Sequence, residues 1–158
     1  MTIANSVEYS TPGLLRRFAA MVYDSLLIMA ISILYAAIMT GINIAIKGAP
    51  ATGERITWGA FGMVVFIGWI LTIGWFFCYF WHKSGQTLGM KTWRMKIVTS
   101  ENLNCPSYTQ CIIRFCCAPI SLCVLGAGYW LMYANTERQT LHDKISKTRT
   151  LLLSKEKK

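Results

Sequence analysis

Residues 18–46 read FAAMVYDSLLIMAISILYAAIMTGINIAI, and this stretch decides the fold class. Its 29 residues contain one charged side chain, Asp24. A helix needs about 20 apolar residues to cross a bilayer, so we predict a membrane-spanning helix here. A carboxylate inside such a helix costs about 3 kcal/mol or more to insert. Asp24 therefore either marks the headgroup boundary or belongs to an intramembrane polar network.

Arg17 lies seven residues before Asp24. Seven residues make nearly two helical turns, which places both side chains on one helix face, roughly 10 Å apart along the axis. We therefore expect Arg17 and Asp24 to form one electrostatic unit. Further along the same segment, small residues recur every fourth position, a spacing that lets another helix approach closely. These helix-packing residues are Ala37, Gly41 and Ala45.

Two more apolar stretches follow in a chain of 158 residues that is 54% apolar. Residues 58–81 carry no formal charge and are long enough to span the bilayer. Residues 115–133 are also uncharged, but Pro119, Gly126 and Gly128 supply places to break a helix. The fold class expected is an all-α polytopic membrane protein with two full transmembrane helices and a third, broken apolar segment. That third segment would be interfacial or re-entrant.

The basic residues gather in short segments beside the apolar runs. Residues 82–114 hold five basic side chains and one acid, and residues 134–158 hold seven basic side chains and three acids. Because cytoplasmic loops collect Lys and Arg, we expect both segments and the N-terminus in the cytoplasm. This placement argues against a nucleic-acid-binding surface. The first apolar run is also longer than the core of a signal peptide, so we expect it to be retained as an anchor.

The charges on both sides of residues 115–133 bear on whether that segment crosses the membrane. If both flanks are cytoplasmic, residues 115–133 cannot cross the membrane a single time. The competing interpretation is a single crossing that leaves the basic tail outside the cell. Residues 93–98 alternate apolar and basic side chains, and both they and residues 148–153 are predicted as short strands. If these two strands pair in the cytoplasm, both flanks lie on one side.

The sequence carries no Walker loop, GxSxG, HExxH or dinucleotide fingerprint, so we do not expect an enzyme. The six cysteines form no CxxC pair and are expected to be reduced and structural. His82 and His142 are expected to be surface residues rather than ligands. We predict neither a metal nor a cofactor.

Three elements in order resemble the RDD family of bacterial integral membrane proteins, which is named for one arginine and two aspartates. They are Arg17 with Asp24, the GQTLGMK motif at residues 85–91, and the TLHDK motif at residues 140–144. The resemblance places the family arginine on Arg17, with Arg16 as an alternative, and its aspartates on Asp24 and Asp143. It covers residues 14–153, implies a bacterial inner-membrane protein and leaves the activity open.

The predicted site is an intramembrane or interfacial charge network in which Asp143 is held by Arg17 or Arg114. One functional hypothesis is proton- or cation-coupled transport by a homo-oligomer, with Asp24 as the exchanging carboxylate. The alternative is a non-transporting module that assembles with or regulates another membrane protein. In both hypotheses the partners are the lipid bilayer and a membrane protein. We predict one domain over residues 1–158, divided into 1–13 (polar segment), 18–46 and 58–81 (spans), 82–114 (basic loop), 115–133 (third apolar segment) and 134–158 (basic tail).

Overall fold

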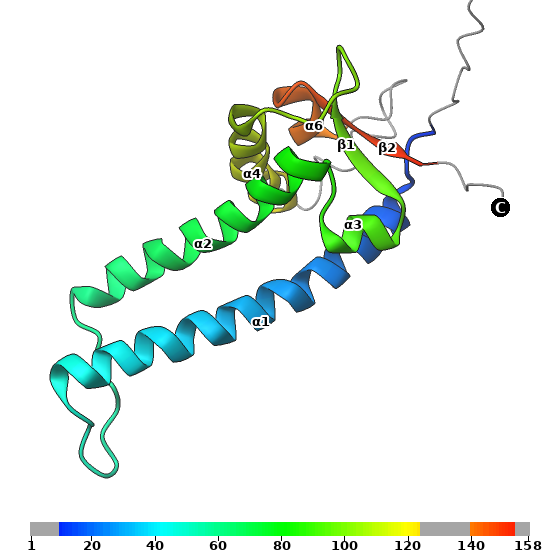
Figure 1. The fold of residues 1–158 in the computed structure, drawn as a ribbon. Helices are drawn as coiled ribbons and strands as arrows, with labels where there is room; N and C mark the ends of the chain where they lie inside the picture. The colour runs from blue at the N-terminus through cyan, green and yellow to red at the C-terminus, as the bar shows by residue number, and fades with distance from the viewer. Residues whose placement is uncertain (1–9, 124–139, 154–158) are drawn as a thin grey trace, which may run out of the picture. The chain divides into compact units, whose positions relative to one another are not determined.

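The computed structural model describes residues 10–123 and 140–153, and within them the chain is mostly helical (Figure 1). It divides into two compact units. The head unit comprises residues up to Asp24 and those from Phe77 onward, and the hairpin unit is Ser25–Phe76. The described elements, in chain order, are α1 (Leu14–Lys47), α2 (Phe61–Ser84), α3 (Leu88–Thr92), β1 (Met95–Thr99), α4 (Tyr108–Cys123), α6 (Leu141–Ile145) and β2 (Thr148–Leu152).

Helices α1 and α2 are each long and apolar enough to cross a membrane. The prediction of two such helices is therefore confirmed, although their bounds differ from the apolar runs. Helix α1 begins four residues earlier than predicted, so Arg17 belongs to its first turns. Helix α2 begins at Phe61 rather than at residue 58 and continues to Ser84. Many large apolar side chains on both helices are exposed, as expected for surfaces that face lipid.

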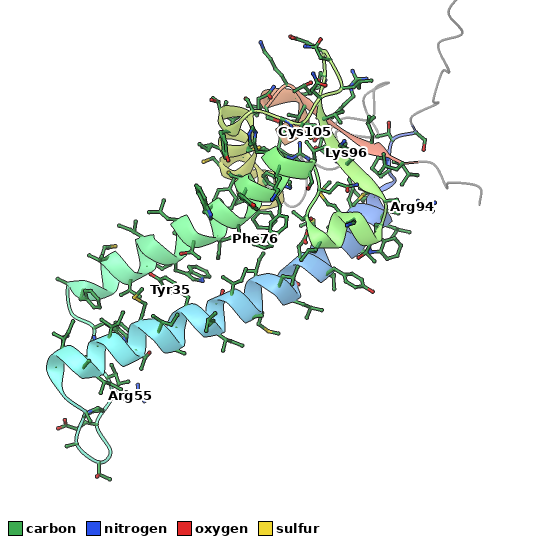
Figure 2. The ribbon with its side chains drawn as sticks, viewed as in Figure 1. Tyr35, Arg55, Phe76, Arg94, Lys96 and Cys105 are labelled. Atoms are coloured by element: carbon green, nitrogen blue, oxygen red, sulfur yellow. The ribbon has the colours of Figure 1, made fainter. Side chains whose placement is uncertain are left out.

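The hairpin unit is held partly by hydrogen bonds between its two helical segments. Tyr35 donates its hydroxyl to the carbonyl of Val65 at 2.8 Å, and Trp69 donates its indole N–H to Ser32 at 2.9 Å. Figure 2 shows Tyr35 between the two helices. A Cβ at Gly68 would lie 2.5 Å from the Tyr35 hydroxyl, so glycine leaves the space that this contact requires.

The head unit contains an antiparallel sheet of two strands, β1 and β2. Its register pairs Met95 with Leu152 and Thr99 with Thr148. The segments predicted as strands thus pair, but β1 starts two residues later than expected. Trp93 ends α3, and Arg94 adopts a φ of 55° before the strand begins. Residues 82–114, predicted as a loop, contain the end of α2, all of α3 and β1, and the start of α4.

Helix α4 begins at Tyr108, before the apolar run, and is described as far as Cys123. Pro119 lies inside it, so of the three places named for a break, this one lies within a continuous helix. Proline lacks the N–H that would bond the preceding turn, yet the helix continues past it. The rest of the third apolar segment, residues 124–133, with Gly126 and Gly128, lies outside the described residues.

An apolar cluster fills the centre of the head unit and joins α1, α2, α3, β1 and α4. Burying a side chain such as Ile97, which is 1% exposed, contributes about 2 kcal/mol. The buried members are Ala20, Cys78, Trp81, Met90, Met95, Ile97 and Cys111. This cluster fixes the start of α1 against the sheet and so positions the polar residues described next.

Candidate functional site

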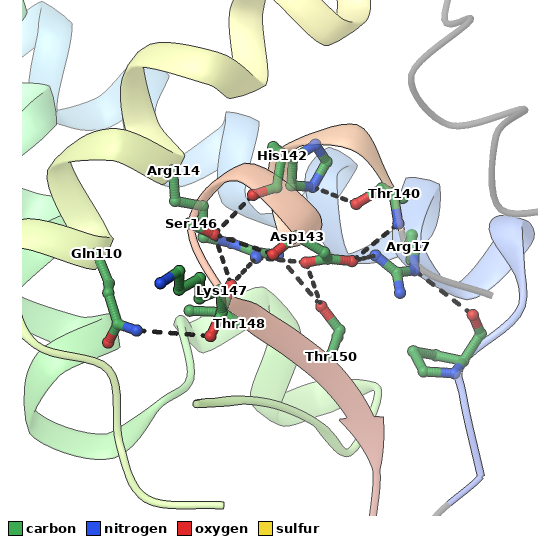
Figure 3. A network of polar contacts seen from close by, with 11 residues as sticks. Arg17, Gln110, Arg114, Thr140, His142, Asp143, Ser146, Lys147, Thr148 and Thr150 are labelled. Atoms are coloured by element: carbon green, nitrogen blue, oxygen red, sulfur yellow. Dashed lines mark hydrogen bonds and ion pairs between the residues drawn. The ribbon is translucent and has the colours of Figure 1, made fainter. Parts of the chain in front are cut away.

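Asp143 lies at the centre of a buried polar cluster in the head unit (Figure 3). Its side chain is 0% exposed and forms ion pairs with two arginines. Arg17, in the first turns of α1, donates Nη1 to Oδ2 at 3.0 Å, and Arg114 of α4 donates Nη1 to Oδ1. One carboxylate thus connects three helices that are far apart in the sequence. We call these residues and their hydroxyl partners the Asp143 cluster.

Hydroxyl groups of β2 accept further hydrogen bonds from Arg114. Its Nη1 donates to Thr148 at 2.8 Å, and its Nη2 donates to Thr150 at 3.2 Å. The Thr150 hydroxyl in turn donates to Asp143 at 3.3 Å. Ser146 bonds the carbonyl of His142 and the hydroxyl of Thr148. Threonines at alternate positions of a strand point to one face, which is why Thr148 and Thr150 reach the same guanidinium.

The electrostatic environment fixes the charge states within this cluster. Burial alone would raise the pKa of Asp143, but Arg114 and Arg17 outweigh it and hold that pKa well below its usual range. Burial, with the positive field of Arg114, lowers the pKa of His142 to about 3. Near neutral pH the cluster therefore contains a charged aspartate, two charged arginines and a neutral histidine.

Among the described residues the charges of the cluster do not balance, because two buried guanidinium groups face a single carboxylate. The guanidinium carbon of Arg114 lies over the ring of Trp81, 5.7 Å from the ring centroid, which adds a cation–π contact. Arg17 also donates Nε to the carbonyl of Pro12 at 3.5 Å. Its Nη2 is buried and has no acceptor among the residues that the structure describes.

Asp24 has a separate set of partners at the beginning of α3. Its Oδ2 accepts a hydrogen bond from the Thr87 hydroxyl at 2.5 Å, and its Oδ1 accepts one from the backbone N–H of Gly89 at 2.9 Å. Thr87 is the N-cap of α3 and accepts from the N–H of Met90. The carboxylate thus lies at the positive end of a short helix, where negative charge is favourable.

This contact explains the glycines of the GQTLGMK motif. A Cβ at Gly89 would overlap the backbone carbonyl of Ala20 and would lie 2.8 Å from Oδ1 of Asp24. Gly85 has a φ of +71°, and a Cβ there would lie 2.5 Å from the carbonyl of Ile97. The first glycine of the motif is required by the turn after α2, and the second by the close approach of α3 to α1.

The structure brings Arg17, Arg114 and Asp143 together, and it gives Asp24 other partners than those expected. Both ion pairs found among the described residues involve Asp143, so the expected pairing of Arg17 with Asp24 is not observed. The reason is geometric: side chains two turns apart on one helix face each reach a different neighbouring element. Ala37, Gly41 and Ala45 are exposed in the hairpin unit, and their packing role stays a prediction.

Sequence reasoning missed several members of both polar sets. His142 was expected at the surface but is only 4% exposed, and it bonds Thr140 at 3.0 Å. His82 is exposed and stacks on Tyr108. One signal was present: Thr140 followed three residues later by Asp143 has the spacing of a helix capping box, and the Thr140 N–H donates to Asp143.

The described residues contain no group of three or more His, Cys, Asp or Glu side chains arranged to hold a metal ion. Five of the cysteines in the described residues are free thiols: Cys78, Cys105, Cys111, Cys116 and Cys117. Burial raises the pKa of Cys111 to about 12, which keeps this thiol protonated and poorly reactive.

Comparison with known proteins gives a similar sequence and a matching family. An uncharacterized protein of Rickettsia prowazekii is 34% identical over 88 residues, covering 56% of this chain. The matched region spans about half the length of that relative, 49%. No solved structure matches. A sequence model of the RDD family matches residues 11–147, which include Arg17, Asp24, the GQTLGMK motif and Asp143. With two apolar helices able to span a bilayer, the chain is a membrane protein that belongs to the RDD family.

Proposed function

We propose that this protein is a non-transporting membrane module that anchors a rigid head at the bilayer surface and assembles with another membrane protein. The observation that carries the proposal is the use of Arg17, Asp24 and Asp143 in contacts within the chain. A transport site needs groups that exchange partners with a ligand. Here each of the three side chains already binds another part of the same head unit.

The energetics of the Asp143 cluster favour a structural role. Breaking a buried ion pair by removing one partner costs about 3–5 kcal/mol. A ligand that displaced Arg17 or Arg114 from Asp143 would have to supply that free energy on every cycle. The hydroxyl groups of Thr148 and Thr150 hold Arg114 in place from a second side. Such an arrangement suits a permanent connection better than a gate.

We further propose that the N-terminus, residues 82–114 and the tail lie in the cytoplasm of a bacterial cell, at the inner membrane. Support comes from the pairing of β1 with β2, since one strand precedes the third apolar segment and the other follows it. Paired strands must lie on the same side of the membrane. The third apolar segment then enters the interface and returns without crossing.

The amphipathic character of α4 agrees with an interfacial position. Its side chains Tyr108, Ile112 and Ile113 are 45%, 54% and 36% exposed, whereas Arg114 points into the protein and is 5% exposed. A helix with its charged residue inside and its apolar residues outside fits a lipid environment better than water.

The second candidate function is proton- or cation-coupled transport by a homo-oligomer. The observation favouring it is that α1, a helix able to span the membrane, carries buried polar side chains at Asp24 and Asn43. The Asn43 side-chain amide nitrogen has no hydrogen-bond partner among the described residues. Two spanning helices cannot enclose a path, so transport requires self-association, and the exposed Ala37–Gly41–Ala45 stripe is the surface proposed for it.

Reconstitution separates the two functions. Purified protein in liposomes is tested for H⁺, Na⁺ and K⁺ flux with entrapped dyes, beside an Asp24→Asn variant at the same protein-to-lipid ratio. The module proposal expects no flux above that of the variant. Ion flux that Asp24→Asn abolishes while the head stays folded would overturn it.

A photo-crosslinker at position 41, used in native membranes, then tests the partner. If the protein is a module that assembles with another membrane protein, the crosslinked product contains this chain and one other protein and has a single defined mass. A bulky residue in place of Ala37 should abolish this product. An adduct at twice the mass of the chain alone would instead support the homo-oligomer.

A further inference from the structure

The head unit contains two segments of the same length and order, separated by 53 positions. Each consists of a five-residue helix followed by a five-residue strand: α3 with β1, and α6 with β2 (Figure 1). The residues before the two helices are Thr87 and Thr140. Their backbone angles are nearly the same, with φ of −80° in both and ψ of 172° and 166°.

The correspondence continues through the connection between helix and strand. The C-cap residues of the two helices are Trp93 and Ser146, and the next residues, Arg94 and Lys147, have positive φ angles of 55° and 51°. Positive φ is uncommon outside glycine, so its recurrence at equivalent positions argues against coincidence. The backbone bonds correspond as well: Arg94 N–H donates to the carbonyl of Lys91, and Lys147 N–H donates to that of Lys144.

The pairing of the strands relates the two segments by an approximate two-fold axis. Moving each residue of the Met95–Leu152 pair to its equivalent gives the Thr99–Thr148 pair, and both pairs are observed. The central pair, Ile97 with Thr150, maps onto itself. Both strands also show the same order of buried and half-buried residues.

The interiors of the two segments differ in chemistry. Met90, Met95 and Ile97 in the first belong to the apolar cluster. The equivalent residues of the second are Asp143, Thr148 and Thr150, which receive Arg114. The identical side chains are Thr, Leu and Lys in the pattern TLxxK, at residues 87–91 and 140–144.

Helix α1 contacts both segments through its own charged residues. Asp24 accepts hydrogen bonds from Thr87 and Gly89 at the start of α3. Arg17 binds Asp143 in α6. We infer that residues 87–99 and 140–152 are two copies of one helix–strand unit, and that Asp24 and Arg17 are positioning residues, each of which holds one copy on α1. This inference concerns the construction of the head and holds whether or not the protein transports ions.

Hydrogen–deuterium exchange of the full chain in nanodiscs, read by mass spectrometry, tests the inference. Asp24→Asn is expected to raise amide exchange in residues 88–93 about tenfold, since losing a charged hydrogen bond costs about 1.5 kcal/mol. Exchange in residues 141–146 should change less than twofold. Arg17→Gln should instead raise amide exchange in residues 141–146 about tenfold and change that in residues 88–93 less than twofold.

Milder variants keep the test decisive if either substitution prevents folding. Thr87→Val removes the hydroxyl that binds Asp24 and caps α3, and Thr87→Ser is the matched control that retains both contacts. Arg17→Lys keeps the charge but loses the guanidinium geometry. Opening of the first copy by Thr87→Val but not by Thr87→Ser, and of the second by Arg17→Lys, would support separate attachment. Equal opening of both copies by either variant would overturn it.

Discussion

Replacing Asp143 by asparagine should be the most damaging single change in the head unit. The substitution keeps the shape of the side chain and removes the charge that two buried arginines share. Asp143 is 0% exposed, and the side chains of Arg17 and Arg114 are 6% and 7% exposed, so water cannot replace the lost partner. Both guanidinium groups would remain buried, and the part of the chain that the structure describes offers them no other counter-ion.

The expected loss follows from these contacts. Removing one member of a buried ion pair costs about 3–5 kcal/mol, so we expect Asp143→Asn to lower the free energy of unfolding by about 4 kcal/mol. Thr150→Val removes hydroxyl bonds from the same cluster without changing its charge and should cost about 1 kcal/mol. Glu101→Gln, at an exposed position, should change stability by less than about 0.5 kcal/mol.

Denaturant titration in detergent micelles, followed by tryptophan fluorescence, measures these differences. The double variant Arg114→Met with Asp143→Asn completes a cycle, and we expect a coupling energy of about 2 kcal/mol or more because the two side chains are in contact. If Asp143→Asn matched Glu101→Gln, or if the two changes were additive, the buried ion pair would not stabilise the head.

Three further outcomes are expected. His142 has a pKa of about 3 in the folded protein against 6.5 in the unfolded chain, so unfolding takes up a proton as the pH falls below 6.5. Between pH 6.5 and pH 5 the free energy of unfolding of the wild type should therefore fall by about 2 kcal/mol, a loss that His142→Gln does not show when unfolding is measured at both pH values. Gly89→Ala should destabilise the head by about 2 kcal/mol because its Cβ meets the Ala20 carbonyl, whereas Gly41→Ala, where a Cβ meets nothing within 4 Å, should be neutral in the same titration. A cysteine at the exposed position Lys147, in a protein otherwise free of cysteine, should resist an impermeant thiol reagent added outside the cell; labelling there would refute the cytoplasmic head.

The sequence by itself determined the membrane class, because hydrophobic length is a local property. Residues 18–46 and 58–81 require apolar surroundings whatever the rest of the chain does, and both lie largely within helices of the structure. The family could also be recognised from three short motifs in order. Arg17 or Arg114 could be named as the partner of Asp143, because this carboxylate comes just after the third apolar segment, where the chain lies close to the bilayer and an arginine can bind a carboxylate bidentately.

Tertiary structure alone decided which charges meet. Arg17 and Asp24 share a helix face, but a pairing between them depends on what else reaches that face, and the sequence does not give those distances. Thr87 and Gly89 lie 63 and 65 residues from Asp24, and Arg17 lies 126 residues from Asp143. The likeness of the two helix–strand units was also hidden, because their interiors diverged into apolar and polar sets while backbone angles and register stayed the same. A backbone conformation tolerates such changes as long as each interior is either well packed or fully hydrogen-bonded. The backbones of the two units are therefore related by a symmetry that their side chains do not show.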